Sequence, residues 1–289
     1  MRRLEFLITE VRNSTDNKDV NGISTSEIVS YFNEAQRHIT TLIFKNNPYA
    51  DMFKVQVEIP AISTGVYTLP SDCYATNAIS MVEARFAETS NNKGYSRIKP
   101  ISESEFSYIF GYITRNNQVL ISGQNDVAQL MSIRITYFKQ LPTLDIRQAK
   151  INAVTANTSI SMSTAPTALY EMDDHCSTVD SQGDQVVSGI YFTNTSGSTL
   201  LTSNTTGVNT FQYVVAGANS CNRSQLPDAC EPYLLNYVKQ RIYTRNNYED
   251  ANKQMYFTEQ QKAEIVSIFS KNKKDDDTIP VTDIGFLNF

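Results

Sequence analysis

The spacing of apolar residues changes its period along this chain of 289 residues. In residues 2–13 and 24–44 the apolar positions recur every three or four residues, and this period predicts amphipathic helices. Ser24 and Glu27 have the spacing of a capping box at the start of the second helix, which should end before Pro48. The N-terminal part of the chain is therefore expected to be helical.

From Phe53 to Ile59 apolar and polar residues alternate, which predicts a half-buried strand. Further strands are expected at 66–70, 78–86, 118–122 and 131–138. The last two should form an antiparallel pair, because the residues 123–126 between them are typical of a turn. A short helix is expected from Ser102 to Phe110, since serine and glutamate open that stretch.

The segment 149–225 is crowded with Ser, Thr, Asn and Gly, and short apolar runs interrupt it. These runs predict strands at 151–154, 159–162, 186–192, 199–201 and 211–215. Short strands separated by turn residues favour a small antiparallel β insertion.

The distribution of charge also sets this segment apart. Residues 151–222 contain no Lys or Arg, and their acidic residues are Glu171, Asp173, Asp174, Asp180 and Asp184, so their charge is -5. The whole chain has 25 basic and 30 acidic residues, which is also -5, so the remainder is neutral. One segment carries all the net charge, which indicates a separate unit.

The helical period returns near the C-terminus. Asp228 is expected to cap a helix with Glu231 in its first turn. The buried positions of this helix are predicted to be Leu234, Leu235, Val238 and Ile242. A further helix is expected from about 249 to 270. The residues predicted on its buried side are Ala251, Met255, Lys262, Ile265 and Phe269.

These elements predict an α+β fold in which a helical bundle from the N- and C-terminal helices carries antiparallel β modules between them. We divide the chain into four parts. They are N-terminal helices plus a β module (1–148), the β insertion (149–225), the C-terminal helices (226–272) and an extended tail (273–289).

The tail has an unusual composition for a chain end. Its predicted hinge is a block of charges at Lys273, Lys274, Asp275, Asp276 and Asp277. Its predicted docking residues are Ile279, Pro280, Val281, Ile284, Phe286, Leu287 and Phe289. Proline and glycine in this stretch oppose a stable helix. So much apolar surface favours docking onto another subunit, and the alternative is a tail folded back on its own domain.

The sequence offers few groups for catalysis or metal binding. The four cysteines lack metal-ligand spacing and are expected to be free thiols. The stretch from Asp173 to Asp184, with His175 and Cys176, is interpreted as an acidic surface loop, and both His38 and His175 as surface or structural residues. Nucleophile and phosphate-loop motifs are absent from the sequence. We therefore expect no enzyme, no cofactor, no metal and no membrane span.

Several short stretches resemble one known family. They are Asn33-Glu34-Ala35-Gln36 in the second helix, Tyr67 to Tyr74, Ile101 to Phe106 and Gly111-Tyr112. Together with the final helix and extended tail, these stretches are similar to the head-to-tail adaptor, or connector, proteins of short-tailed bacteriophages. The resemblance covers roughly residues 1–140 and 226–289, and the β insertion departs from the smallest members.

The resemblance implies a structural protein of the virion neck that assembles in the host cytoplasm. Members of that family form a homo-oligomeric ring, commonly a dodecamer, between the portal protein and the next tail (nozzle) protein. The C-terminal tail packs on the portal, and double-stranded DNA passes through the channel without sequence-specific binding. Two alternatives remain, a receptor-binding (adhesin) module that recognises its ligand through the insertion and a virion-associated cell-wall hydrolase.

Overall fold

The computed structural model describes most of the chain. The described residues are 1–15, 22–46, 51–75, 78–86, 94–106, 108–123, 130–146, 148–163, 175–196, 198–246 and 250–270. The chain divides into two compact units, one formed by Met1–Asn47 with Pro142–Phe289 and the other by Pro48–Leu141. The predicted segment 1–148 thus spans parts of both units, whereas the insertion 149–225 and the C-terminal helices lie within the first.

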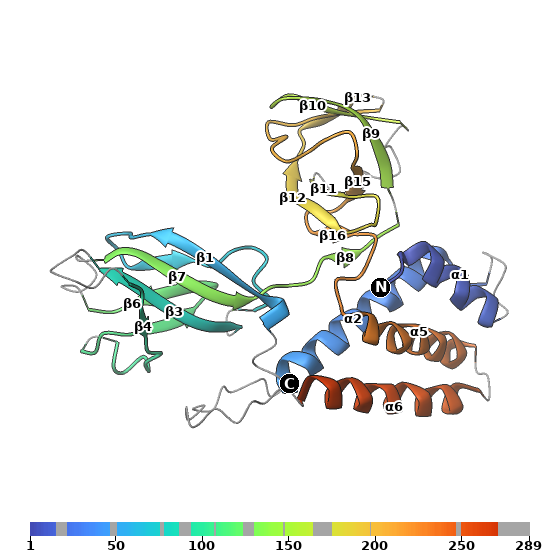
Figure 1. Ribbon diagram of the computed structural model, residues 1–289, viewed down its shortest axis with the longest axis horizontal. Coiled ribbons are helices and arrows are strands. Elements are labelled where there is room, and N and C mark those ends of the chain that lie inside the picture. The colour runs from blue at the N-terminus through green and yellow to red at the C-terminus, as the bar shows by residue number, and fades with distance from the viewer. Residues whose placement is uncertain are drawn as a thin grey trace. The chain divides into compact units, whose positions relative to one another are not determined.

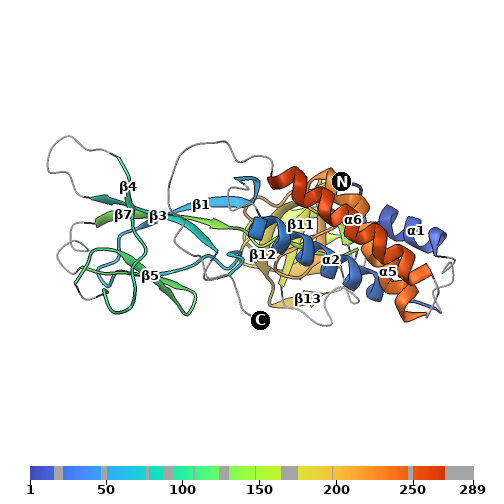
Figure 2. The same cartoon turned by 90° about the horizontal axis from the view of Figure 1, so that it is seen from below.

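The first unit holds the described α-helices, which come from the two ends of the chain (Figure 1). They are α1 (Leu4–Ser14), α2 (Thr25–Asn46), α5 (Glu231–Arg245) and α6 (Asp250–Ser270). α1 packs on α2 and α5, and α6 packs on the same two helices (Figure 2). The predicted α+β fold, with N- and C-terminal helices in one bundle and antiparallel sheets between them in sequence, is confirmed.

Helix α2 follows its prediction closely. The backbone N–H of Glu27 donates to Ser24 Oγ at 3.2 Å, so the capping residue is the predicted serine. The apolar stripe Ile28, Phe32, Ala35, Ile39 and Ile43 is almost fully buried. The helix ends at Asn46, two residues before the proline that prevents its continuation.

The start of α5 differs from its prediction. Asp228 begins a short 3-10 helix, η2 (Asp228–Cys230), and makes no side-chain cap. Its carboxylate instead pairs with the amino group of Met1. The α-helix begins at Glu231, with Pro232 in the first turn, where a missing N–H is tolerated. The carboxylate that was expected to cap the helix therefore binds a charged group outside the helix.

The insertion forms a seven-stranded antiparallel sheet in the order β12-β11-β15-β9-β10-β14-β13. Its strands are β9 (Gln148–Thr155), β10 (Ser159–Met162), β11 (His175–Val179), β12 (Gln185–Tyr191), β13 (Asn194–Ser196), β14 (Thr199–Leu201) and β15 (Tyr213–Ala216). It has a core of its own, which includes Ile151, Ile160 and Leu200. A short parallel pair, β8 (Thr143–Leu144) and β16 (Ser220–Cys221), joins the segments that lead into and out of it.

The interpretation of His175 and Cys176 as part of a surface loop is wrong. Both residues belong to β11, which lies between β12 and β15 and so has a neighbouring strand on each side. Cys176 is fully buried in the core of the insertion. The neighbouring Asp173 and Asp174 lie outside the described residues.

The second unit contains two antiparallel sheets over one core. The first, in the order β1-β7-β3-β4, has the strands β1 (Lys54–Pro60), β7 (Leu130–Phe138), β3 (Ile79–Phe86) and β4 (Ser96–Ile98). The second, in the order β2-β6-β5, has the strands β2 (Val66–Thr68), β6 (Gln118–Ile121) and β5 (Tyr112–Arg115). A short 3-10 helix, η1 (Asp51–Phe53), precedes β1.

Two predictions for this unit are wrong. The strands at 118–122 and 131–138 do not pair, because β6 forms a hairpin with β5 through Asn116 and Asn117, both with positive φ, as tight hairpins require. β7 lies instead between β1 and β3. The described residues from Ser102 to Phe110 form turns and not a helix, although the backbone N–H of Ser102 donates to Glu105 Oε2 at 2.9 Å.

Candidate assembly surface

Helix α6 is the last described element, and the predicted hinge and docking segment follow it in the sequence. Between Asp250 and Ser270 it contains neither glycine nor proline, and Lys, Gln, Glu, Ala and Met make up about half of it. Its inward side is short of apolar residues. Thr258, Ile265 and Phe269 are its buried residues.

Amide contacts supplement this small buried side. Asn236 of α5 donates from Nδ2 to Gln261 Oε1 at 2.8 Å, and its carbonyl accepts from Gln254 Nε2 at 3.5 Å. The hydroxyl of Thr258 donates to the carbonyl of Gln254 at 2.9 Å, within the helix. The two bonds of Asn236 therefore add polar contacts to the hydrophobic packing of α6 on α5.

Four large apolar side chains of α6 are exposed among polar ones. Met255 is 52% exposed, Tyr256 68%, Phe257 41% and Ile268 45%. They are spread over more than half of the helix circumference, with Met255 and Phe257 roughly 160° apart, and we name the four together the α6 apolar face. The prediction that Met255 lies on the buried side is wrong, because it lies roughly 80° around the helix from Ile265 and so beyond the narrow covered sector.

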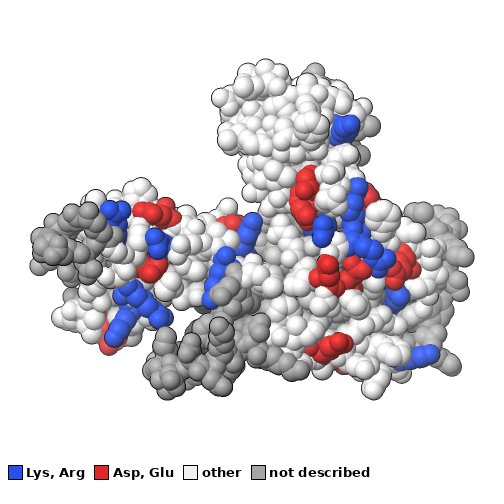
Figure 3. Space-filling view, in the orientation of Figure 1, with Lys and Arg blue, Asp and Glu red and all other residues white. Residues whose placement is uncertain are grey.

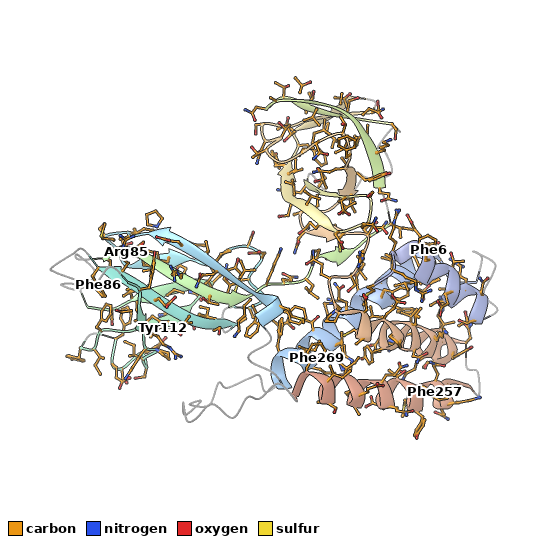
Figure 4. All side chains as sticks on the ribbon, in the orientation of Figure 1. Phe6, Arg85, Phe86, Tyr112, Phe257 and Phe269 are labelled. Atoms are coloured by element: carbon orange, nitrogen blue, oxygen red, sulfur yellow. The ribbon has the colours of Figure 1, made fainter. Side chains whose placement is uncertain are left out.

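The exposed area of the α6 apolar face is distributed around the helix. Three large apolar side chains and a tyrosine, each about half exposed, present on the order of 400 Å² of surface. Figure 4 shows Phe257 on the outer side of α6, whereas Phe269 points towards the bundle. A helix with apolar residues on all sides is usually covered on all sides. Within the described residues α6 is covered on one side only.

The predicted docking residues, from Ile279 to Phe289, and the predicted hinge, from Lys273 to Asp277, lie outside the described residues. Their placement stays a prediction. α6 ends at Ser270, and the predicted hinge separates its exposed apolar residues from the docking segment in the sequence.

The four residues Asn33-Glu34-Ala35-Gln36 each have a structural role on α2. The side-chain amide of Asn33 donates to the carbonyl of Leu144 at 2.9 Å and accepts from its N–H at 2.7 Å. Gln36 binds the segments on either side of the insertion, and Ala35 is fully buried. The four residues therefore attach α2 to distant parts of the first unit.

Glu34 lies in an ion-paired network between α2 and α5. Burial opposes ionisation of this carboxylate, but hydrogen bonds from Arg241 and Tyr237 outweigh it and lower the pKa of Glu34. The Tyr237 hydroxyl donates to Glu34 Oε1 at 2.8 Å, and Arg241 donates from Nε to Oε2 at 3.2 Å. The network holds the two helices together, and each of these three charged or polar groups has a partner within the bundle.

His38 also has a partner on α5. Its Nδ1 is hydrogen-bonded to the hydroxyl of Tyr233, a residue with no exposed surface. Burial lowers the pKa of His38, and Lys262 adds to this effect. Burial also raises the pKa of Tyr233, so both the protonated tyrosine and the neutral imidazole are favoured. This arrangement is a contact between helices, consistent with a structural role.

The described acidic residues of the insertion stabilise a turn. Asp180 Oδ1 accepts from the backbone N–H groups of Gln182 at 2.8 Å and Asp184 at 3.0 Å. The carboxylate of Asp184 lies 3.3 Å from Arg223 Nη1. Beyond this turn, the face of the insertion seen in the upper part of Figure 3 is almost free of charged side chains.

The remaining chemistry-bearing groups are also accounted for. The four cysteines form no disulfide bond with one another, and burial raises the pKa of the Cys230 thiol to about 12. In the described part of the chain, no group of three or more His, Cys, Asp or Glu side chains is arranged to hold a metal ion. None of the helices that the structure describes has the length and apolar character needed to cross a bilayer.

Comparison of the sequence with protein-family models and with curated proteins gave no match. The candidate surface thus depends on the geometry alone. Sequence periodicity missed the α6 apolar face because apolar residues lie on all sides of this helix. No single apolar stripe then distinguishes the buried residues from the exposed ones. The adjacency of Tyr256 and Phe257, which lie about 100° apart on a helix and cannot share one narrow stripe, was the available signal.

Proposed function

We propose that this protein is a structural head-to-tail adaptor of a tailed bacteriophage, a ring protein that joins the portal to the tail and catalyses no reaction. The observation that carries this proposal is the set of exposed apolar residues on α6, the helix that precedes the charged hinge and the apolar docking segment in the sequence. A stretch of this kind suits contact with other protein chains.

The bundle supports a role as a scaffold. Pairs between α2 and α5, such as Glu34 with Arg241 and Glu27 with Arg245, use charged side chains to fix helices to each other. A conduit for DNA should also avoid strong phosphate binding, and a net charge of -5 suits that requirement.

The docking residues would act as anchors on the portal. Each apolar side chain buried there contributes roughly 25 cal/mol for every Å² removed from water. A single short segment of this kind binds weakly because ordering it costs conformational entropy. A ring presents many copies at once, so the combined attachment becomes effectively permanent.

The experiment that tests this proposal compares the full chain with a chain that lacks Thr278 to Phe289. Both are added to portal-containing heads purified without the adaptor, and bound protein is measured after sedimentation. We expect the shortened chain to keep its far-ultraviolet circular dichroism and lose attachment, because the described fold ends at Ser270.

A control of equal length replaces the seven docking residues by serine and keeps the hinge. Its attachment should also be lost, since tail length alone supplies no apolar contact. Attachment of the shortened chain at the level of the full chain would contradict the proposed role of the segment.

A further inference from the structure

The insertion presents four side chains on the outer face of its sheet, where β15 lies beside β9. Tyr213 of β15 pairs directly with Lys150 of β9. The antiparallel ladder continues with a backbone hydrogen bond of 3.1 Å between the next two residues, so Phe211 lies opposite Asn152. These four residues therefore form two neighbouring cross-strand pairs, and we name them the Phe211 cluster.

The burial of the neighbouring residues shows which way the cluster points. Gln212 and Val214 on β15 are buried, and so are Ala149 and Ile151 on β9. Successive side chains of a strand point to opposite faces of a sheet, so the members of the cluster point away from the core. Phe211 is accordingly 84% exposed, and the other three are exposed or partly exposed. Opposite side chains lie about 5 Å apart and diagonal ones roughly 7 to 8 Å apart, so one small ligand can contact all four.

Hydrogen bonds fix the backbone that presents the phenylalanine. The N–H of Phe211 donates to Asn209 Oδ1 at 2.9 Å. The side chain of Gln212 is only 3% exposed, and its Nε2 donates to the carbonyl of Gly207 at 2.9 Å. These bonds hold the turn before β15 in one shape, so the exposed ring loses little conformational entropy when it binds a ligand.

Lys150 is the charged member of the cluster, and it is the one Lys or Arg among positions 149–222. Its ammonium group forms no ion pair with another residue that the structure describes. Because the protein leaves this charge unpaired, it can pair with an anionic group of a ligand. Residues 151–222 carry a charge of -5, so a ligand with many negative charges, such as nucleic acid, is disfavoured.

We propose that the Phe211 cluster binds a polysaccharide through a uronic acid unit, a sugar ring with one carboxylate. The face of an aromatic ring is electron-rich and attracts the polarised C–H groups on one side of a sugar ring, which here stacks on Phe211 and Tyr213. The carboxylate pairs with Lys150. The side-chain amide of Asn152 exchanges hydrogen bonds with the sugar hydroxyls.

The shape of the site favours a sugar over a peptide. An apolar side chain of a peptide partner binds well when it fills a desolvated pocket, whereas the members of the cluster lie side by side on the outer face of a sheet. A sugar ring needs only an exposed aromatic ring with polar groups beside it. This role is additional to the proposed function and does not rest on it, because the cluster belongs to the insertion and the docking residues belong to the tail.

Isothermal titration calorimetry on the full-length protein tests this proposal. The uronate probes are hexasaccharides of hyaluronan and of alginate, the neutral probe is chitohexaose, and the nucleic-acid probe is single-stranded oligo-dT. We expect saturable binding of at least one uronate probe. The neutral probe should bind about threefold more weakly, because it lacks the partner of the exposed ammonium group. Oligo-dT should bind more weakly still.

Two substitutions separate the parts of the site. Phe211→Ala should weaken binding of every sugar probe by about tenfold, because it removes the stacking surface. Lys150→Met approximately keeps the length of the side chain and removes its charge, so it should weaken uronate binding about threefold and leave binding of the neutral probe unchanged. The matched control is Phe6→Ala, which changes a phenylalanine that is 61% exposed on α1 and should bind like wild type.

Several outcomes would overturn the proposal. They are no binding of either uronate probe, unchanged binding after Phe211→Ala, and tighter binding of oligo-dT than of the uronates. Equal weakening by Phe211→Ala and Phe6→Ala would overturn it too, because the effect would then not belong to the cluster. Phe211→Ala should attach to portal-containing heads like wild type, so failure of the sugar site and failure of the proposed function are measured separately.

Discussion

Gln36 offers a sharp test of how the first unit is held together. This side chain is only 4% exposed. Its Nε2 donates to the carbonyl of Pro142 at 2.8 Å, and its Oε1 accepts from the hydroxyl of Ser224 at 2.6 Å. One amide on α2 thus binds the chain segments that lead into and out of the insertion.

Gln36→Leu keeps the approximate volume of the side chain and removes both hydrogen bonds. The carbonyl of Pro142 and the hydroxyl of Ser224 are then left without these bonds in a buried site, at a cost of roughly 1 to 3 kcal/mol each. Burial of the leucine side chain returns about 1 kcal/mol of this. We therefore expect the free energy of unfolding of the first unit to fall by about 3 kcal/mol.

Urea unfolding followed at 222 nm measures this change, because the described α-helices all belong to the first unit. The control is the double variant of Gln36→Leu with Ser224→Ala, which removes one of the unpaired groups. Its loss of unfolding free energy should be about 1 kcal/mol smaller than the sum of the losses of the two single variants. A Gln36→Leu chain that unfolds within about 0.5 kcal/mol of wild type would refute the reasoning.

Two further predictions concern the second unit and the pH dependence of the bundle. Gly111→Ala would place a Cβ 2.5 Å from Ile101 Cγ2 and 2.9 Å from the carbonyl oxygen of Lys99. Hydrogen exchange in β5 and β6 should therefore show that the second unit loses about 2 kcal/mol of stability. Gly94→Ala, with open space around it, should leave the stability unchanged, and equal effects of the two substitutions would contradict the prediction. Burial lowers the folded-state pKa of His38 below its ordinary value of 6.5, so the stability that its neutral form contributes above pH 6.5 is lost as the pH falls through the folded-state pKa. Urea unfolding measures the free energy of unfolding at pH 7.5 and at pH 5.5. The difference between these two values should be smaller for His38→Phe than for wild type, and an unchanged difference would count against this role.

Local patterns were sufficient to predict much of the fold. The capping box at Ser24 and the stripe from Ile28 to Ile43 specify α2 through interactions within a few residues of each other. In the insertion, turn residues separate short apolar runs, and the strands β10 and β14 form where those runs predicted them. Elements of this kind depend on period and capping, which a sequence displays directly.

Contacts between distant residues could not be predicted in this way. Asn33 binds both backbone groups of Leu144, a residue 111 positions further along the chain, and no local pattern identifies that partner. Pairing of strands is also non-local, which is why β6 was assigned to the wrong neighbour. The prediction that Met255 is buried was wrong because the helical period determines only the direction in which each side chain points. Tertiary packing determines how much of the helix surface is covered.

The candidate site was predicted in part. Composition predicted a docking segment from Ile279 to Phe289, which lies outside the described residues and stays a prediction. The α6 apolar face became visible only with the exposure of Tyr256 and Phe257 in the folded chain. The sequence thus predicted one contact segment, and the exposed apolar residues of α6 could be recognised only in the fold.

Site-specific photo-cross-linking tests the proposed docking most directly. A photoreactive phenylalanine analogue at position 286 is activated in assembled particles, and the cross-linked peptides are identified by mass spectrometry. We predict products that join Phe286 of this protein to the portal protein. Products that join it solely to residues 1–270 of its own chain would contradict the proposal that the segment docks on the portal.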